Sequence, residues 1–265
     1  MYDTIASTNF YLFAIPAVIM FGLSKGGLSA LGALGMPILS LAISPVKAAA
    51  ITLPILMVQD WIGVWSFRRD FDRRNLFILA PASLIGVAFA WILAAHVSES
   101  AVRFVVGAIS LGFVAFMLIR DRLPDRDPLP ATLLPGMFWG AASGFTSFIS
   151  HAGGPPFLVY VMPQKLQPKV FAGTSVIFFA LVNLLKLPPY FLLNQFSLEN
   201  LVASLALLPV GIVATYAGVW ITKRVPAERF YNAILVLSFV VGVKLIFDSL
   251  HDSGVGLSGD RKSVV

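Results

Sequence analysis

The sequence predicts an all-α, polytopic integral membrane protein built from two inverted-topology repeats of about five segments each. Three observations lead to this fold class. Hydrophobic residues make up 58% of the 265-residue chain and only 12% of its residues are charged, whereas soluble domains carry roughly 25% charged residues. Apolar runs long enough to cross a bilayer recur along the whole length. The second half of the chain also echoes the first.

Ten apolar segments are predicted, and a polar, proline-bearing linker at about 120–130 divides them into two sets of five. The first set forms repeat 1 (about 8–119), the second forms repeat 2 (about 131–250), and a polar tail follows at 251–265. The segments lie at about 8–24, 26–43, 46–66, 75–95 and 101–119, and then at 131–149, 153–162, 170–191, 200–222 and 230–248. The whole chain is then expected to form a single transmembrane domain.

Two pairs of matching segments support the repeat. NLFILAPASLIG, from Asn75, matches NLVASLALLPVG, from Asn200, at an offset of 125 residues. VRFVVGAISLGFV, from Val102, matches ERFYNAILVLSFV, from Glu228, at an offset of 126. Any two leucine-rich helices resemble one another, so each match is weak alone, but their shared order and spacing indicate a true repeat.

An odd number of segments in each repeat requires the two repeats to have opposite orientations, and the loop charges agree. The loop at 67–74 carries four arginines, and its counterpart at 191–200 has no basic residue. The loop at 96–100 has no lysine or arginine, and its counterpart at 223–229 has three. Basic loops face the cytoplasm, so both termini are expected in the periplasm. No basic residue precedes Lys25, so we expect no cleavable signal peptide.

The segments at 26–43 and 153–162 are short or broken by glycine and proline, and they indicate where a site forms. Inverted repeats with broken helices are typical of secondary transporters, whose sites lie where short helix ends meet. Glycines allow sharp turns and close approach of a ligand, and helix N-termini attract anions. We therefore predict a site for a small anion. The predicted substrate-binding residues belong to the two breaks and their hydroxyl neighbours: Ser24, Lys25, Gly26, Gly27, Ser147, His151, Gly153, Gly154 and Pro155.

Ionisable residues inside the spans are candidates for ion coupling. Asp60 is the only acidic residue well inside a span, so Asp60 and His151 are predicted to couple transport to protons, supported by Asn183 and Lys186. Asp60 aligns with Asn183 in the repeat, at an offset of 123. Simpler roles remain open at this stage. Asp60 can pair with a lysine to hold two helices together, His151 can make a structural hydrogen bond, and Lys25 can snorkel to a membrane face.

Several functions are not supported by the sequence. The chain has no cysteine, so disulfides and thiolate metal sites are ruled out, and we predict no metal or cofactor. Its net charge of +6 is spread over short loops, which does not indicate nucleic-acid binding. A phosphate-binding GxxxxGK[ST] loop is absent, which argues against ATP-driven transport. Ser147 and His151 lack a GxSG motif and have poor geometry for nucleophile activation, so we do not predict an intramembrane enzyme.

Around the breaks the sequence resembles the TauE/SafE sulfite exporter family, also called the toluene-sulfonate uptake permease group. The resemblance covers about 10–248 and rests on GLSKGGLSALG with MPIL, and on SGFTSFISHAGGPPFLVYVMPQKL with FAGTSVIFFALVN. It implies a multi-pass protein of the bacterial inner membrane that transports sulfite, sulfonates or related sulfur-containing or carboxylate anions, often as an exporter.

The sequence therefore predicts a secondary active exporter of a small sulfur-containing or organic anion. It would work by alternating access, linked to the proton-motive force. Its partners would be the anion, protons or another coupling ion, and the lipid bilayer, in a monomer or a homodimer. A passive anion channel with the same site is the main alternative, and a membrane enzyme is the second.

Overall fold

The structure, a computed structural model, describes residues 8–94, 98–122, 127–222, 224, 236 and 239–251. These residues are helical apart from short connections. Within them, five helices are long and apolar enough to cross a membrane, which confirms the predicted all-α polytopic class. Parts of the predicted loops at 96–100 and 223–229, part of the segment at 230–248, and nearly all of the tail at 251–265 lie outside the described residues.

The helices follow the order of the predicted segments. They are α2 (Thr8–Lys25), α3 (Gly32–Leu39), α4 (Pro45–Phe67), α5 (Arg73–Ala94), α6 (Glu99–Arg122), α7 (Leu133–Ser150), α8 (Gly154–Val161), α9 (Pro168–Leu192) and α10 (Leu198–Thr222). Two 3-10 turns, η1 (Ser29–Leu31) and η2 (Met162–Gln164), precede α3 and follow α8. Residues 239–251 form a further helix.

The two broken segments differ in how the second helix begins. α8 starts at Gly154, directly at the predicted break. In the first half, the chain passes through η1 before α3 starts at Gly32, so the predicted helix at 26–43 is shorter and begins later than expected. The cause is Gly27, whose φ of +114° does not belong to a helix and is accessible mainly to glycine.

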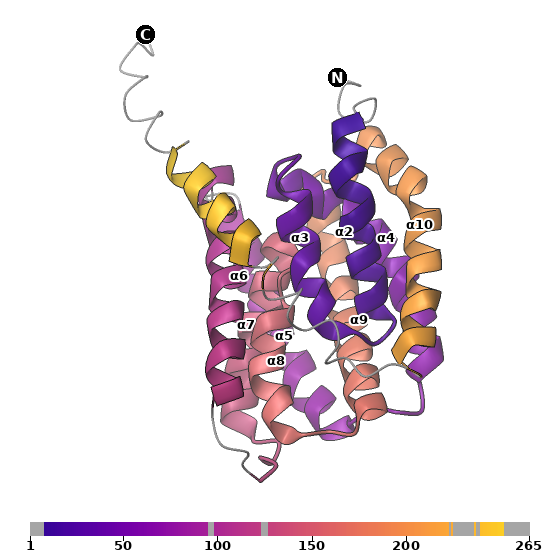
Figure 1. Cartoon of the computed structure of the whole chain (residues 1–265), viewed down its shortest axis with the longest axis vertical. Coiled ribbons are helices and arrows are strands. Elements are labelled where there is room, and N and C mark those ends of the chain that lie inside the picture. The colour runs from indigo at the N-terminus through magenta and orange to yellow at the C-terminus, as the bar shows by residue number, and fades with distance from the viewer. Residues whose placement is uncertain are drawn as a thin grey trace.

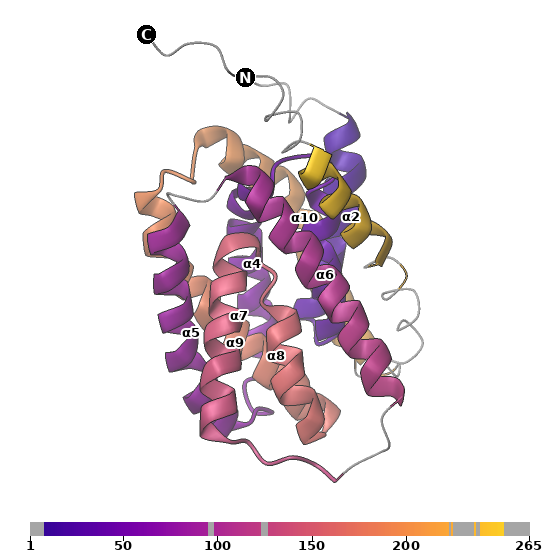
Figure 2. The same ribbon diagram turned by 90° about the vertical axis from the view of Figure 1, so that its left-hand side faces the viewer.

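α2 and α3 form one helical hairpin, and α7 and α8 form another, and the closed ends of the two hairpins point in opposite directions (Figures 1 and 2). A Cβ on Gly27, at the end of the first hairpin, would contact Ala172, near the start of α9. His151, at the end of the second hairpin, contacts Lys186, near the other end of α9. The two hairpins therefore enter the bundle from opposite ends and reach past each other beside α9.

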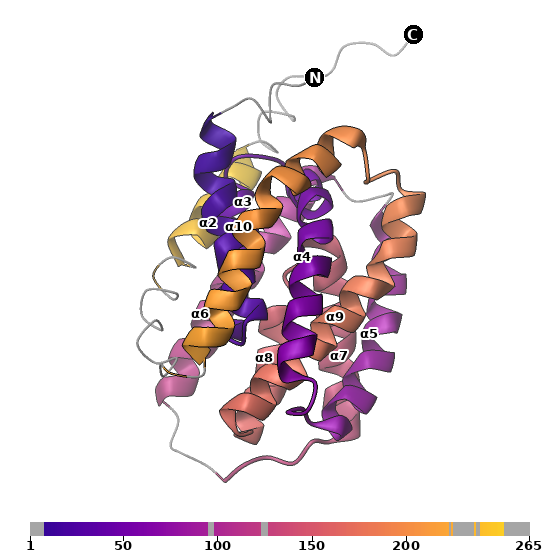
Figure 3. The same cartoon turned by 90° about the vertical axis from the view of Figure 1, so that its right-hand side faces the viewer.

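Each hairpin packs against one long helix of the other half of the chain. α2 lies along α10 (Figure 3), and α7 lies along α5 (Figure 2). Glycines permit both contacts, because a Cβ on Gly26 would lie 2.5 Å from the backbone of Gly218, and one on Gly86 would collide with the carbonyl oxygen of Ala141. The two halves of the chain therefore pack into each other, and the pair of inverted repeats stays a prediction.

The bundle is apolar on the outside and polar within. Large exposed side chains such as Trp61, Phe77 and Leu134 are apolar, as expected of a surface that faces lipid. The buried set includes lysine, aspartate, histidine and several amides and hydroxyls. α4 and α9 are the most buried of the five membrane-span helices, so they place their polar side chains at the centre.

Candidate functional site

Lys25, the last residue of α2, forms a buried ion pair with Asp60 of α4. The Lys25 Nζ lies 2.5 Å from Asp60 Oδ1, and the two side chains are 9% and 5% exposed. The other carboxylate oxygen of Asp60 accepts a 2.6 Å hydrogen bond from the Asn183 amide of α9. The ammonium also lies 5.4 Å from the centre of the Phe179 ring, within cation–π range. Lys25 is therefore an internal residue and does not snorkel to a membrane face.

This arrangement joins three residues that the sequence had singled out separately. Asp60 and Asn183 align in the predicted repeat, and here they contact each other across the bundle. The sequence had predicted that Lys25 offers its positive charge to an anion, but that charge is already opposed by a carboxylate at contact distance. The helix-pairing role proposed as an alternative for Asp60 matches this geometry, and it leaves little net charge on the pair.

A second polar cluster joins the closed end of the α7–α8 hairpin to α9. The Lys186 Nζ lies 2.5 Å from Nδ1 of His151. It also donates to the carbonyl oxygen of Ser147 at 3.1 Å and to the Ser147 hydroxyl at 3.2 Å. The other ring nitrogen of His151 lies 2.9 Å from the carbonyl oxygen of Ala49 in α4. Since a carbonyl only accepts, Nε2 carries the hydrogen and Nδ1 faces the lysine.

The backbone of His151 fixes this geometry. His151 caps α7 in the left-handed conformation, with φ of 50° and ψ of 21°, and its N–H donates to Ser147 at 2.9 Å. Glycine is the usual residue at such a cap, and a histidine there is uncommon. Residues in such conformations persist where the surrounding contacts determine them. The contacts of the ring with Lys186 and Ala49 provide that constraint.

The two clusters lie one helical turn apart, because Asn183 and Lys186 occupy positions i and i+3 of α9. Together they contain two lysines, one carboxylate and one histidine. Within the described part of the chain, Lys186 forms no ion pair, and its partners are a histidine, a carbonyl and a hydroxyl. The centre of the bundle therefore carries an excess of positive charge whenever Lys186 is protonated.

The remaining predicted binding residues are distributed around the breaks. The Ser24 hydroxyl donates to the carbonyl oxygen of Ser29 at 3.3 Å and so closes the first break. Gly26 packs on α10, so close helix packing explains this glycine, and an approaching ligand is not required. Gly27 has the positive φ described above.

In the second break, Gly153 packs against the carbonyl oxygen of Ser143 and accepts a 2.7 Å hydrogen bond from the Ser143 hydroxyl. A Cβ on Gly154 would meet nothing within 4 Å, which makes it the one predicted glycine with free space around it among those described. Pro155 is buried in the first turn of α8, where proline is favoured because no N–H is required.

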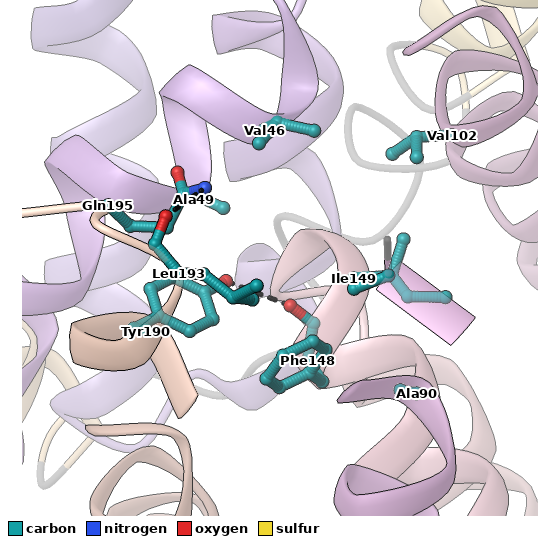
Figure 4. A pocket seen from close by; sticks show the side chains of 10 residues that line it. Val46, Ala49, Ala90, Val102, Phe148, Ile149, Tyr190, Leu193 and Gln195 are labelled. Atoms are coloured by element: carbon teal, nitrogen blue, oxygen red, sulfur yellow. Dashed lines mark hydrogen bonds between the residues drawn. The ribbon is translucent and has the colours of Figure 1, made fainter. Parts of the chain in front are cut away.

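A cavity of about 110 Å³ lies beside the second cluster. It is lined mainly by apolar side chains, with Tyr190 and Gln195 as the polar members (Figure 4). Ala49, whose carbonyl oxygen contacts His151, is part of its wall. The Tyr190 hydroxyl donates to the carbonyl oxygen of Phe148 at 2.8 Å, a bond drawn in Figure 4. Tyr190 and Phe148 thus form the side of the cavity that adjoins the His151 cluster.

Sequence reasoning missed several residues of this region. Gln59 is fully buried beside Asp60 and donates to the carbonyl oxygen of Gly211 at 3.3 Å, and its own Oε1 has no hydrogen-bond partner among the described residues. Ser29 and Ser175 join η1 to α9 by a 2.9 Å hydrogen bond. Tyr190 follows two consecutive prolines in α9, and this proline pair inside a span was the available signal for it.

The comparisons with known proteins agree with this architecture. The family model described as "Sulfite exporter TauE/SafE" matches residues 14–245. That range contains both hairpins and both polar clusters. No curated protein and no solved structure matches the chain significantly. The match covers most of the chain, and the chain therefore belongs to the TauE/SafE sulfite exporter family of membrane transporters.

Proposed function

We propose that the protein is a secondary active transporter that exports a small sulfur-containing or organic anion, such as sulfite or a sulfonate, across the bacterial inner membrane. The anion binds where the closed ends of the two hairpins meet α4 and α9. Transport is linked to the proton-motive force and proceeds by alternating access. The family match supports the class of substrate.

One observation carries this proposal: the buried centre has more positive than negative groups. Lys25 is matched by Asp60, and Lys186 has only neutral partners among the described residues. A buried charge without a counter-charge is costly, and a bound anion would remove that cost. Carboxylates predominate over basic residues where a transporter selects a cation, and this centre has the reverse composition.

The arrangement of the helices supports alternating access. Hairpins that enter from opposite ends, each packed on a long helix of the other half, are the arrangement expected if two inverted repeats move against each other. We propose that both termini lie in the periplasm, because the basic loops are expected to face the cytoplasm. A C-terminal fusion to a fluorescent protein that matures only in the cytoplasm should stay dark, and a bright fusion would contradict the proposed orientation.

The proposal is tested with purified protein in sealed liposomes. We expect an imposed pH gradient to drive accumulation of sulfite or a short sulfonate, and an uncoupler to abolish it. Equilibration that the uncoupler does not affect would indicate a passive channel, and chemical conversion of the anion would indicate an enzyme. Lys186→Met should abolish accumulation. Lys244→Met is the matched control, because Lys244 pairs with Asp248 on the exposed surface, where its side chain is 55% exposed.

A further inference from the structure

Lys186 is an unusual lysine because it is completely buried and still lacks a carboxylate. Its exposed fraction is 0%. Three acceptors surround the Nζ: Nδ1 of His151, and the carbonyl oxygen and hydroxyl of Ser147. Three acceptors match the three hydrogens of an ammonium group. The site therefore orients a protonated lysine and supplies no negative charge to balance it.

The groups that face Lys186 come from several elements. They are His151 from the end of α7, Lys25 from the end of α2, Asp60 from α4, and Tyr190 from the next turn of α9 itself. η1 contains no charged residue. In α5 the only charged residues are Arg73 and Arg74. They follow Asp72, whose backbone N–H donates to Thr174 near the start of α9, and therefore lie toward the opposite end of α9 from Lys186. Lys25 repels a positive charge on Lys186, and Asp60 is already engaged by Lys25.

The protonated state of this cluster therefore depends on a charge that the described residues do not provide. Burial of an unpaired ion costs free energy, and such a group loses its charge unless a partner is present. A cavity lies close to this cluster beside Tyr190 and Phe148, and it shares Ala49 with the His151 contact. An anion that enters through this cavity would supply the missing negative charge.

We infer that Lys186 and His151 together form the proton-binding site of the protein, and that one proton and one anion bind as a pair. This inference rests on the proposed function and changes its coupling residues: the proton is held by Lys186 and His151, and Asp60 serves as the fixed counter-ion of Lys25. Because the pair moves together, its direction follows the sum of the anion and proton gradients, so export requires an outward anion gradient larger than the inward proton gradient. On loading, a proton from water becomes one N–H bond on the shared Lys186–His151 pair. On release, that N–H bond breaks and the proton returns to water.

Linkage between the two ligands is reciprocal, so each must tighten the binding of the other. Where the free protein is unprotonated at this site, anion affinity should fall about tenfold for each unit rise in pH if a single proton is linked. For a monovalent anion the loaded site gains no net charge. This lowers the cost of moving the loaded site through the low-dielectric centre of the bundle.

The test uses the full-length protein in detergent with methanesulfonate as the probe, because its charge does not change near neutral pH. Titration calorimetry in two buffers of different ionisation enthalpy counts the protons taken up with the anion. We expect about one proton per anion for the parent and for Lys244→Met. Lys186→Met should take up none and bind at least tenfold more weakly. Lys186→Arg, which is permanently charged, should bind the anion without proton uptake and without pH dependence.

Three results would overturn the inference. Anion binding by the parent with no proton uptake would leave the proposed transport function intact and refute the coupling. A proton uptake that persists in Lys186→Met and disappears in Asp60→Asn would assign the proton to Asp60. Failure of the parent to bind methanesulfonate, sulfite and short carboxylates at any pH would refute the proposed function and, with it, this inference.

Discussion

Replacement of Lys25 by methionine tests whether the Lys25–Asp60 pair holds the first hairpin to the core. Methionine keeps most of the apolar volume of lysine and removes its charge. Asp60 would keep its hydrogen bond from Asn183 but lose the only ion-pair partner described for it. The variant therefore leaves a buried carboxylate, 5% exposed in its side chain, with no opposing charge at contact distance.

The expected effect is large because both members of the pair are buried. At an effective dielectric constant of about 20, two unit charges at this separation attract by roughly 6–7 kcal/mol before desolvation is counted. Removal of one partner from a buried ion pair typically costs about 3–5 kcal/mol. For a chain of this size that corresponds to a drop in melting temperature of roughly 6–20 °C. The double variant Lys25→Met/Asp60→Asn leaves no unpaired charge and should recover most of this loss.

Thermal unfolding of the four proteins of this cycle in one detergent measures the coupling. Lys244→Met serves as the matched control, since removal of an exposed ion pair costs no more than about 1 kcal/mol. The reasoning is refuted if Lys25→Met melts like the parent. It is also refuted if the double variant is as unstable as the sum of the two single variants, because the two groups would then act independently.

Further predictions concern the breaks and their neighbours. Gly26→Ala should destabilise the protein by about 1–3 kcal/mol in the same unfolding assay, because its Cβ would meet the Gly218 backbone at 2.5 Å. Gly154→Ala, with open space around its Cβ, should melt within about 0.5 kcal/mol of the parent, and a larger loss would contradict the described packing. His151→Asn keeps a residue that tolerates the left-handed conformation but removes the ring, so it should remain folded and lose the pH dependence of anion binding; an unchanged pH profile would exclude the ring from coupling. Tyr190→Phe removes the hydrogen bond to Phe148 and should lower the free energy of unfolding by roughly 1–3 kcal/mol in denaturant titration; an unchanged free energy would show that this hydrogen bond does not stabilise the fold.

The fold class was predictable because it depends on local and repeated features. Long apolar runs specify membrane-spanning helices, and the glycine breaks marked the closed ends of both hairpins. The start of α3 at Gly32 was not predicted, because it depends on the φ of +114° at Gly27, which the pattern of small and apolar residues does not specify. The packing of α2 on α10 also lay beyond the sequence pattern, since small residues such as Gly218 occur on many helix faces without marking a partner.

The site was predictable as a set of residues but not as a set of contacts. Glycines, buried charges and hydroxyls were rare enough in the spans to be identified one by one. Which lysine pairs with which acceptor depends on the rotation and depth of each helix, which periodicity does not fix. Lys186 was expected only to support the site, and its contact with His151, 35 positions away in the chain, arises because α7 ends beside the last turns of α9.

The two breaks occupy equivalent places in the chain and have different chemistry. Lys25 and His151 are 126 residues apart, the same spacing as in the second pair of repeat segments, and each is the residue at the closed end of its hairpin. Lys25 contacts a carboxylate on α4, whereas His151 contacts a lysine on α9. If both breaks carried ion pairs, the centre would be neutral and would have no electrostatic reason to admit an anion. If neither did, two uncompensated charges would destabilise the empty protein. On the proposed coupling, one pair is satisfied and the other needs a counter-charge, and a single anion and a single proton would complete the site.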